Sequence, residues 1–259
     1  MRQPKIVFFD IDGTLFTKDM ILPQSAKEAI KVLQEQGVYV AIATGRAPFM
    51  FEDLRKELNI STFVSFNGSY VVADGEVIEK KPLHMQDLEK LCQFADKSEH
   101  PMVFLDHEEA RANQDKHADI AESLRDLKME YPPIDESFYK QTETYQALLF
   151  CGREEEDQYS RQFKPFDFVR WHRLALDVLP TGGSKAEGLR AVAKHLGYSM
   201  DETAAFGDAL NDREMLREAG IGIAMGNALE EVKREADMVT SPVYEDGIRE
   251  GLRKIGLLS

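Results

Sequence analysis

Residues 6–14 read IVFFDIDGT, an apolar run followed by two carboxylates, a glycine and a threonine. The apolar run is continuous rather than alternating, which is typical of a central parallel strand covered on both faces. Such a strand delivers its next residues to the carboxyl edge of the sheet, where α/β proteins place their chemistry. Glycine at position 13 allows the chain to turn, so we expect Asp10 and Asp12 to approach one pocket. An isolated DxDG is also explained by acidic residues that only cap a turn.

The composition limits the kinds of protein that this chain can be. Its 259 residues suffice for one large domain or two smaller ones, and a hydrophobic fraction of 43% is typical of a globular protein. The net charge of -14 argues against nucleic acid or a membrane surface as the main partner, because both require a basic surface. No apolar run approaches the roughly 20 residues that cross a bilayer, so we expect a cytoplasmic protein. Cys92 and Cys151 lack metal-ligand spacing, which predicts reduced, partly buried thiols.

Residues 1–82 repeat a strand-then-helix order, which predicts the first part of a parallel α/β sheet. After the first strand we expect a helix at 25–36, a strand at 38–43, a helix opened by Pro48 and a strand at 62–66. Strand-like residues at 69–72 and 77–79 flank Asp74-Gly75 and predict a β-hairpin flap.

Residues 83–180 have a different character, with charged helices and strands in adjacent pairs. This change predicts a separate α+β module inserted into the first domain. Tyr131-Pro132-Pro133 interrupts the pattern. The expected helices are 86–97, 115–127 and one through 154–156, and the expected strands are 102–105, 111–113, 145–151, 166–171 and 174–178.

Residues 181–259 return to the strand-helix order and are expected to complete the first sheet, with strands at 203–207 and 221–225. Residues 184–187 read SKAE, which predicts a capping box that opens a helix ending at Gly197. Lys185 would then lie in the first turn of this helix, beside free backbone N–H groups.

Four polar clusters are predicted at the carboxyl ends of strands. Each one alone has a simpler explanation as a helix cap, a surface cation or an acid in a first helical turn. Together they supply what phosphoryl transfer needs, namely an oxygen nucleophile, a proton donor, groups that grip phosphoryl oxygens and hard ligands for magnesium. The clusters are Asp10 with Asp12, then Thr44, then Lys185, and finally Asp208 with Asp212.

Five motifs in this order resemble those of the haloacid dehalogenase superfamily, specifically its Cof-type (subfamily IIB) phosphatases. The resemblance covers essentially the whole chain and implies a Rossmann-like core, residues 1–82 and 181–259, with an inserted α+β cap domain, residues 83–180. The motifs are DIDGT (10–14), TGR (44–46), SFNG (65–68), GGSKAEGL (182–189) and GDALNDREML (207–216).

The resemblance also implies roles for individual acidic residues. Asp10 would attack phosphorus and become an aspartyl phosphate, and Asp12 would protonate the leaving group and then activate water. A Mg²⁺ ion would be held by Asp10, the main-chain carbonyl of Asp12 and Asp208. Asp212 would orient Lys185 or a metal-bound water.

A second set of residues is implied to bind the phosphorylated substrate. Thr44, the Gly45 N–H and Lys185 would hold the phosphoryl oxygens, with Thr44 and Lys185 also counted as catalytic. Asn67 is explained equally by a turn or by a place in the site, and we favour the site. Arg46 and Asn211 complete the predicted set.

The predicted function is magnesium-dependent hydrolysis of small phosphomonoesters, such as a sugar phosphate, in a monomer or homodimer. A lid of the predicted size leaves room for a small phosphorylated metabolite rather than a phosphoprotein. A phosphomutase of the same superfamily would share every residue named above, and a non-catalytic metabolite-binding protein is a third hypothesis. Neither a nucleic acid nor a membrane is an expected partner.

Overall fold

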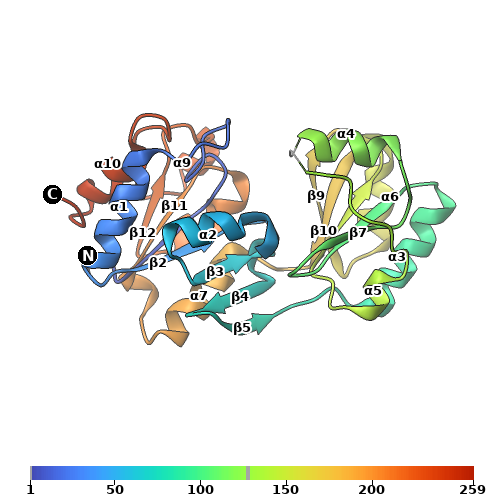
Figure 1. The fold of residues 1–259 in the computed structure, drawn as a ribbon, viewed down its shortest axis with the longest axis horizontal. Coiled ribbons are helices and arrows are strands. Elements are labelled where there is room, and N and C mark those ends of the chain that lie inside the picture. Colours follow the sequence, from blue (N-terminus) through green and yellow to red (C-terminus); the bar gives the residue numbers. More distant parts are fainter. Residues whose placement is uncertain (1, 127–128) are drawn as a thin grey trace. The chain divides into compact units, whose positions relative to one another are not determined.

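The computed structural model describes residues 2–126 and 129–259, and the chain divides into two compact units (Figure 1). The core unit contains the chain up to Arg46, Phe51–Lys80 and Ser184–Ser259. The inserted unit contains Ala47–Met50 and Lys81–Gly183. The predicted division lay at 82/83 and 180/181, with residues 47–50 left in the core.

An eight-stranded sheet forms the centre of the core unit, in the order β13-β12-β11-β1-β2-β3-β4-β5. Pairing is parallel from β13 to β3 and antiparallel for β4 and β5, which confirms the predicted α/β class and the hairpin flap. All residues of β1 are fully buried, as its continuous apolar run predicts. The strands are β1 (Ile6–Phe9), β2 (Tyr39–Ala43), β3 (Thr62–Ser65), β4 (Tyr70–Ala73), β5 (Glu76–Lys80), β11 (Thr203–Gly207), β12 (Ile221–Ala224) and β13 (Met238–Val239).

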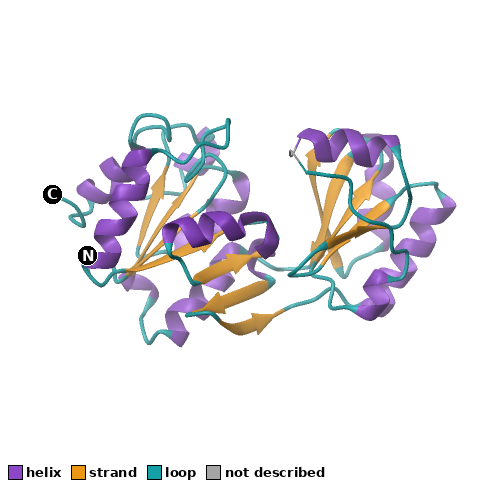
Figure 2. Ribbon diagram, in the orientation of Figure 1, coloured by secondary structure: helices purple, strands orange, loops and turns teal. Residues whose placement is uncertain are grey.

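Helices lie on both sides of this sheet (Figure 2). On one side, α7 (Lys185–His195), α8 (Arg213–Glu218) and α9 (Glu230–Lys233) pack against alternate residues of the strands, including Ile6 and Phe8. On the other side, α1 (Gln24–Glu35) packs with α2 (Glu52–Leu58) and α10 (Gly247–Lys254). The helix predicted to begin at Pro48 is instead a 3₁₀ turn, Pro48–Phe51, followed by α2. Phe51, at the joint, has non-helical backbone angles (φ −135°), which separates the two segments.

A five-stranded antiparallel sheet in the order β7-β6-β8-β10-β9 forms the inserted unit. Helices α3, α5 and α6 cover one of its faces, around Phe104, Leu149 and Leu176. The helix α5 was not predicted, and the predicted helix 115–127 begins only at Ala118, while residue 127 lies outside the described residues. The elements are α3 (Met85–Lys97), β6 (Met102–Leu105), β7 (Ala110–Ala112), α4 (Ala118–Asp126), α5 (Phe138–Gln141), β8 (Gln146–Phe150), α6 (Glu156–Gln162), β9 (Phe166–His172) and β10 (Ala175–Pro180).

Both cysteines are free thiols of the inserted unit, and both are buried rather than partly buried. Burial raises the pKa of Cys151 to about 11 and that of Cys92 to about 12, so both thiols stay protonated near neutral pH. Among the described residues, no helix has the length and apolar character needed to span a bilayer.

Candidate active site

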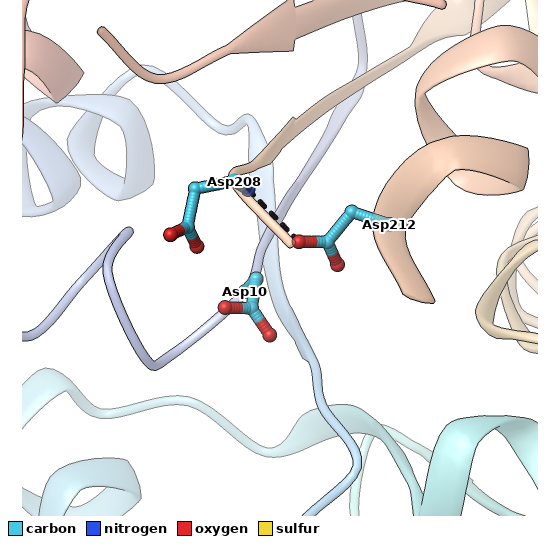
Figure 3. A group of neighbouring side chains, drawn as sticks. All are labelled: Asp10, Asp208 and Asp212. Atoms are coloured by element: carbon cyan, nitrogen blue, oxygen red, sulfur yellow. Dashed lines mark hydrogen bonds between the residues drawn. The ribbon is translucent and has the colours of Figure 1, made fainter. Parts of the chain in front are cut away.

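Polar side chains from separate chain segments meet at the carboxyl edge of the core sheet (Figure 3). Asp10 follows β1, Thr44 follows β2 and Asp208 follows β11. Because β1 lies between β2 and β11 and all three run parallel, their ends are neighbours. The sheet order therefore brings together residues that are far apart in the sequence.

The turn after β1 depends on Gly13, whose φ is +83°. A Cβ at this position would lie 2.1 Å from Oδ2 of Asp208, so only glycine lets the turn approach that carboxylate. The side chain of Asp10 is 7% exposed, whereas that of Asp12 is 54% exposed. Burial is the main cause of the raised pKa of Asp10, and the charge of Asp12 adds to it, so the two carboxylates lie near each other as expected, one buried and one exposed.

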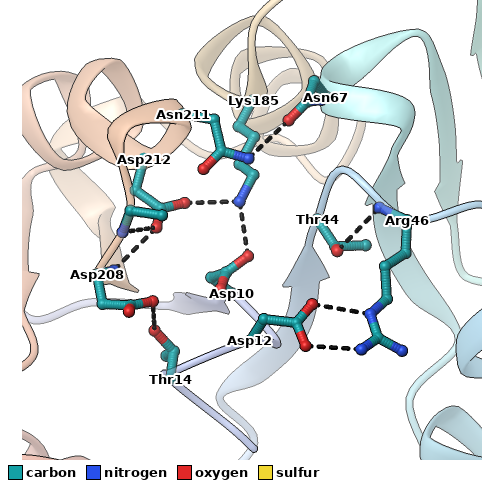
Figure 4. A network of polar contacts seen from close by, with 11 residues as sticks. Asp10, Asp12, Thr14, Thr44, Arg46, Asn67, Lys185, Asp208, Asn211 and Asp212 are labelled. Atoms are coloured by element: carbon teal, nitrogen blue, oxygen red, sulfur yellow. Dashed lines mark hydrogen bonds and ion pairs between the residues drawn. The ribbon is translucent and has the colours of Figure 1, made fainter. Parts of the chain in front are cut away.

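Lys185 lies between two carboxylates, with Nζ donating to Oδ1 of Asp10 and Oδ1 of Asp212 at 2.6 Å each (Figure 4). Its side chain is only 1% exposed. Burial opposes its positive charge, but Asp10 and Asp212 outweigh burial and hold its pKa above the usual range. Burial raises the pKa of Asp10 well above its usual range, against the influence of Lys185 and with a further contribution from Asp212.

Lys185 reaches this network from the first residue of α7, which confirms its predicted place in the first turn of that helix, although it was also grouped with the strand-end clusters. Ser184 is the N-cap residue of α7, but its side chain makes no capping hydrogen bond, so the predicted capping box is wrong. The Glu187 carboxylate lies 4.0 Å from Arg190 on the outer surface of the helix.

Asp212 uses both carboxylate oxygens within the protein. Oδ1 accepts from Lys185, and Oδ2 accepts from the backbone N–H groups of Asp208 and Ala209 at 2.9 Å each. Its side chain is fully buried. Asp212 therefore fixes both the lysine and the segment that carries Asp208, in keeping with its predicted orienting position.

The carboxylate of Asp208 faces the turn after β1. Oδ1 accepts from the hydroxyl of Thr14 at 3.3 Å, and Oδ2 accepts from the amide of Asn227 at 3.2 Å. Burial and then the charge of Asp212 raise the pKa of Asp208 to about 6. A carboxylate with a raised pKa is one whose negative charge a nearby cation would stabilise.

A divalent cation fits this group of acids. Single carboxylate oxygens of Asp10, Asp208 and Asp212 all lie within 4.8 Å of one another. Asp212 has one oxygen on the Lys185 ammonium and the other on two backbone N–H groups, so Asp10 and Asp208 are the better candidates for ligands. Hard oxygen donors of this kind suit magnesium, and one lysine does not balance three buried or partly buried carboxylates.

Arg46 forms a bidentate ion pair with Asp12, with Nε 2.8 Å from Oδ2 and Nη2 2.6 Å from Oδ1. Its backbone N–H donates to the hydroxyl of Thr44 at 3.1 Å, which places Thr44 within the same turn. Two chain segments are thus joined by Arg46 on the exposed side of the site. The sequence had assigned Arg46 to the substrate, whereas its partner in the structure is Asp12.

Asn67 lies in a tight turn in which Phe66, Asn67 and Gly68 all have positive φ values, 49°, 52° and 101°. For a phenylalanine this backbone is strained, and such strain persists only where the surroundings impose it, whereas asparagine adopts it more readily. Oδ1 of Asn67 accepts from Nδ2 of Asn211 at 2.9 Å. A Cβ on Gly45 would lie 3.0 Å from Nδ2 of Asn67, so Asn67 occupies a turn and also faces the other predicted substrate groups.

Two residues that contact Asp208 were not assigned a role from the sequence. Thr14 belongs to the DIDGT motif itself, and Asn227 comes two residues after the last buried residue expected for the strand at 221–225. The rule that selected Asp10 and Asp208, a polar residue just beyond a buried strand, would also have selected Asn227.

Residues 7–252 match the haloacid dehalogenase-like hydrolases. The chain belongs to this family. It is 45% identical over 254 residues to the "Putative phosphatase YkrA" of Bacillus subtilis (strain 168), covering 98% of each chain. The predicted Cof-type resemblance and the predicted phosphatase class are confirmed by these relatives.

Solved structures share the fold over nearly the whole chain. A hypothetical protein of Geobacillus kaustophilus HTA426 is 53% identical, with a TM-score of 0.96 and 98% of this chain and 100% of that chain covered. The subclass IIB sugar phosphatase BT4131 is 31% identical, with a TM-score of 0.85 and 98% and 100% covered.

Proposed function

We propose that this protein hydrolyses small phosphomonoesters through an aspartyl-phosphate intermediate and uses Mg²⁺. The observation that carries the proposal is the buried carboxylate of Asp10, held by Lys185 beside Asp208. A nucleophilic carboxylate next to a fixed ammonium and a second acid is an arrangement suited to an anionic substrate that arrives with a cation.

Asp10 attacks phosphorus in line, and the alcohol leaves. Lys185 already donates to Asp10, so its ammonium lies where the phosphoryl oxygens gather negative charge. The Thr44 hydroxyl, the Gly45 N–H and the amides of Asn67 and Asn211 are proposed to bind the remaining phosphoryl or substrate oxygens. When bound, Mg²⁺ offsets the repulsion between nucleophile and substrate, with Asp10, the Asp12 carbonyl and Asp208 as its protein ligands.

Asp12 is proposed as the general acid that protonates the leaving oxygen and then as the base that activates water. Its carboxylate is exposed, so it can reach the leaving oxygen of a substrate whose phosphoryl group lies against the more deeply buried Asp10. Arg46 is proposed to hold this carboxylate by two hydrogen bonds between turnovers and to release it when a substrate anion offers the guanidinium another partner.

The residues at 83–180 are proposed to act as the cap that selects the substrate, with 1–82 and 181–259 as the catalytic domain. Relatives named as phosphatases, among them a sugar phosphatase, favour a small phosphorylated metabolite. A sugar phosphate is therefore the first class to test.

The test is release of inorganic phosphate from a panel of small phosphomonoesters, with magnesium and with EDTA. We expect magnesium-dependent release that Asp10→Asn abolishes, while Asp53→Asn, an exposed acid in the first turn of α2, leaves it unchanged. Transfer of phosphate between positions of a sugar, with a bisphosphate activator and little free phosphate, would instead support a mutase. No turnover of any ester by either route would contradict the proposal.

A further inference from the structure

Asn227 follows β12 at the same edge of the core sheet as Asp10 and Asp208. It lies 19 residues beyond Asp208 in the sequence and 214 residues beyond Gly13, yet it contacts both. None of the five motifs that define the site contains it. The fold, rather than any of the five motifs, therefore brings this side chain to the site.

Both ends of the Asn227 amide are used. Nδ2 donates to the carbonyl oxygen of Gly13 at 2.8 Å and to Oδ2 of Asp208 at 3.2 Å. Oδ1 accepts from the backbone N–H of Val243 at 2.9 Å. One side chain thus joins the turn after β1, the end of β11, the end of β12 and the loop after β13.

The orientation of this amide follows from its partners. A flipped amide would place Oδ1 against a carbonyl oxygen and a carboxylate oxygen, and it would leave the Val243 N–H facing an NH₂ group. Only one orientation satisfies all three contacts. The NH₂ group of Asn227 is therefore directed toward Asp208.

The contact is well placed to control the direction of the Asp208 carboxylate. Thr14 donates to one oxygen and Asn227 to the other, so each oxygen has a fixed donor. The same NH₂ group holds the carbonyl of Gly13, next to the peptide whose Asp12 carbonyl is a proposed metal ligand. Groups that orient metal ligands in this way commonly change metal affinity by 10–100-fold when removed.

We propose that Asn227 is a positioning residue that sets the geometry of the Mg²⁺ site, by holding Asp208 and the turn after β1 at a fixed separation. This inference rests on the proposed function, because it assumes that Mg²⁺ binds at Asp10 and Asp208. Asn227 touches neither the substrate nor the reacting atoms. Its effect is on the affinity of the folded protein for the ion.

The test is titration calorimetry with magnesium chloride alone, on the full chain, for Asn227→Ala and the smaller change Asn227→Ser. We expect the Mg²⁺ dissociation constant to rise about 10-fold or more in both variants. Circular dichroism and thermal unfolding show whether each variant is folded. Steady-state assays would show a raised Mg²⁺ requirement, with kcat largely restored at saturating Mg²⁺ and KM for the ester little changed.

Gln34→Ala is the matched control, because Gln34 also bridges two backbone groups through an amide, at Leu58 and Asn59. It should lower stability without changing Mg²⁺ affinity. If the wild-type protein binds Mg²⁺ and both Asn227 variants bind it with the same affinity, this inference is overturned and the proposed function stays intact. If the wild-type protein binds no Mg²⁺, the inference and the metal-dependent function fail together. Should Asn227→Ala not fold, Asn227→Ser decides in the same way.

Discussion

The core unit and the inserted unit bury their charged groups in different ways. In the core unit, Asp10, Lys185 and Asp212 come from three distant segments and form one buried network of opposite charges. In the inserted unit, Asp177 of β10 accepts a hydrogen bond from the neutral amide of Gln146 at 2.7 Å. Burial raises the pKa of Asp177 to about 7, which the hydrogen bond only partly opposes.

The two sheets explain this difference. In a parallel sheet every strand ends at the same edge, so the polar residues that follow several strands converge. In an antiparallel sheet successive strands end at opposite edges, so polar residues on neighbouring strands meet in pairs across the sheet face. A shared charged site is therefore expected at the edge of the core sheet, and isolated polar pairs are expected on the sheet of the inserted unit.

Loss of the buried cation should have the largest effect. Lys185→Met leaves Asp10 and Asp212 without their shared partner, and we expect the free energy of unfolding to fall by about 3–5 kcal/mol. Phosphate release should fall by about 100-fold or more. Urea denaturation and phosphate assays check both. Lys27→Met removes an exposed ion pair with Glu57 and should lower the free energy of unfolding by no more than about 1 kcal/mol. If the two variants lost the same free energy of unfolding, the contrast between the buried network and an exposed ion pair would be contradicted.

The second-largest expected effect is the change in stability on adding Mg²⁺, which should depend on the core unit and not on the inserted unit. Added Mg²⁺ should stabilise the wild-type protein by about 2.7 kcal/mol at a hundredfold excess over its dissociation constant, and EDTA should reverse this. Asp208→Asn should abolish the rise in the thermal midpoint, and it should stabilise the metal-free protein because it removes a carboxylate that is disfavoured by burial and by the charge of Asp212. Asp96→Asn, in the inserted unit near Glu136, should keep the full response to Mg²⁺. If Asp96→Asn lost its stabilisation by Mg²⁺, the ion would bind somewhere other than the site at Asp208.

Steric crowding at the core edge gives a smaller expected effect. Gly13→Ala introduces a Cβ 2.1 Å from Asp208, in addition to the strain of a positive φ, and should cost about 2 kcal/mol or more together with most of the activity. Gly75 has almost the same φ, +82°, but nothing within 4 Å of an added Cβ. Gly75→Ala should cost only about 1 kcal/mol and leave phosphate release unchanged. Thermal unfolding and activity of the two variants, compared side by side, would show whether the crowding matters.

The smallest effect is expected for the pH response of the inserted unit. The folded-state pKa of Asp177, about 7, lies above its ordinary value of 3.8, so its contribution to stability is fully present below about pH 4 and is lost as the pH rises through 7. Asp177→Asn should remove this loss. We expect the free energy of unfolding above pH 7 to rise by only about 1 kcal/mol, because part of the Asp177 side chain remains exposed to solvent. Urea midpoints measured between pH 4 and 8 test this. The exposed Asp157→Asn variant should follow the wild-type profile, and a parallel profile for Asp177→Asn would refute the assignment.

Many elements could be predicted because their signals are local. The apolar run at 6–9 gave β1 with its bounds, and the run at 203–207 gave β11. The helix α5 was missed because its four residues form a single turn, which is too short for a periodic pattern. The capping box failed because a sequence signature does not fix where Ser184 and Glu187 direct their side chains.

By itself, the sequence determined the α/β class, the order of the five motifs and the placement of Asp10 and Asp208 beyond buried strands, because hydrophobic runs and motif spacing are properties of adjacent residues. Only the tertiary structure decided which groups are partners: Arg46 with Asp12, Lys185 with Asp10 and Asp212, and Asn227 with Gly13 and Asp208. A hydrogen bond requires two atoms within about 3 Å in the right direction. For these residues, which are 19 to 214 positions apart, that separation depends on the order of strands in the sheet, which no local pattern contains.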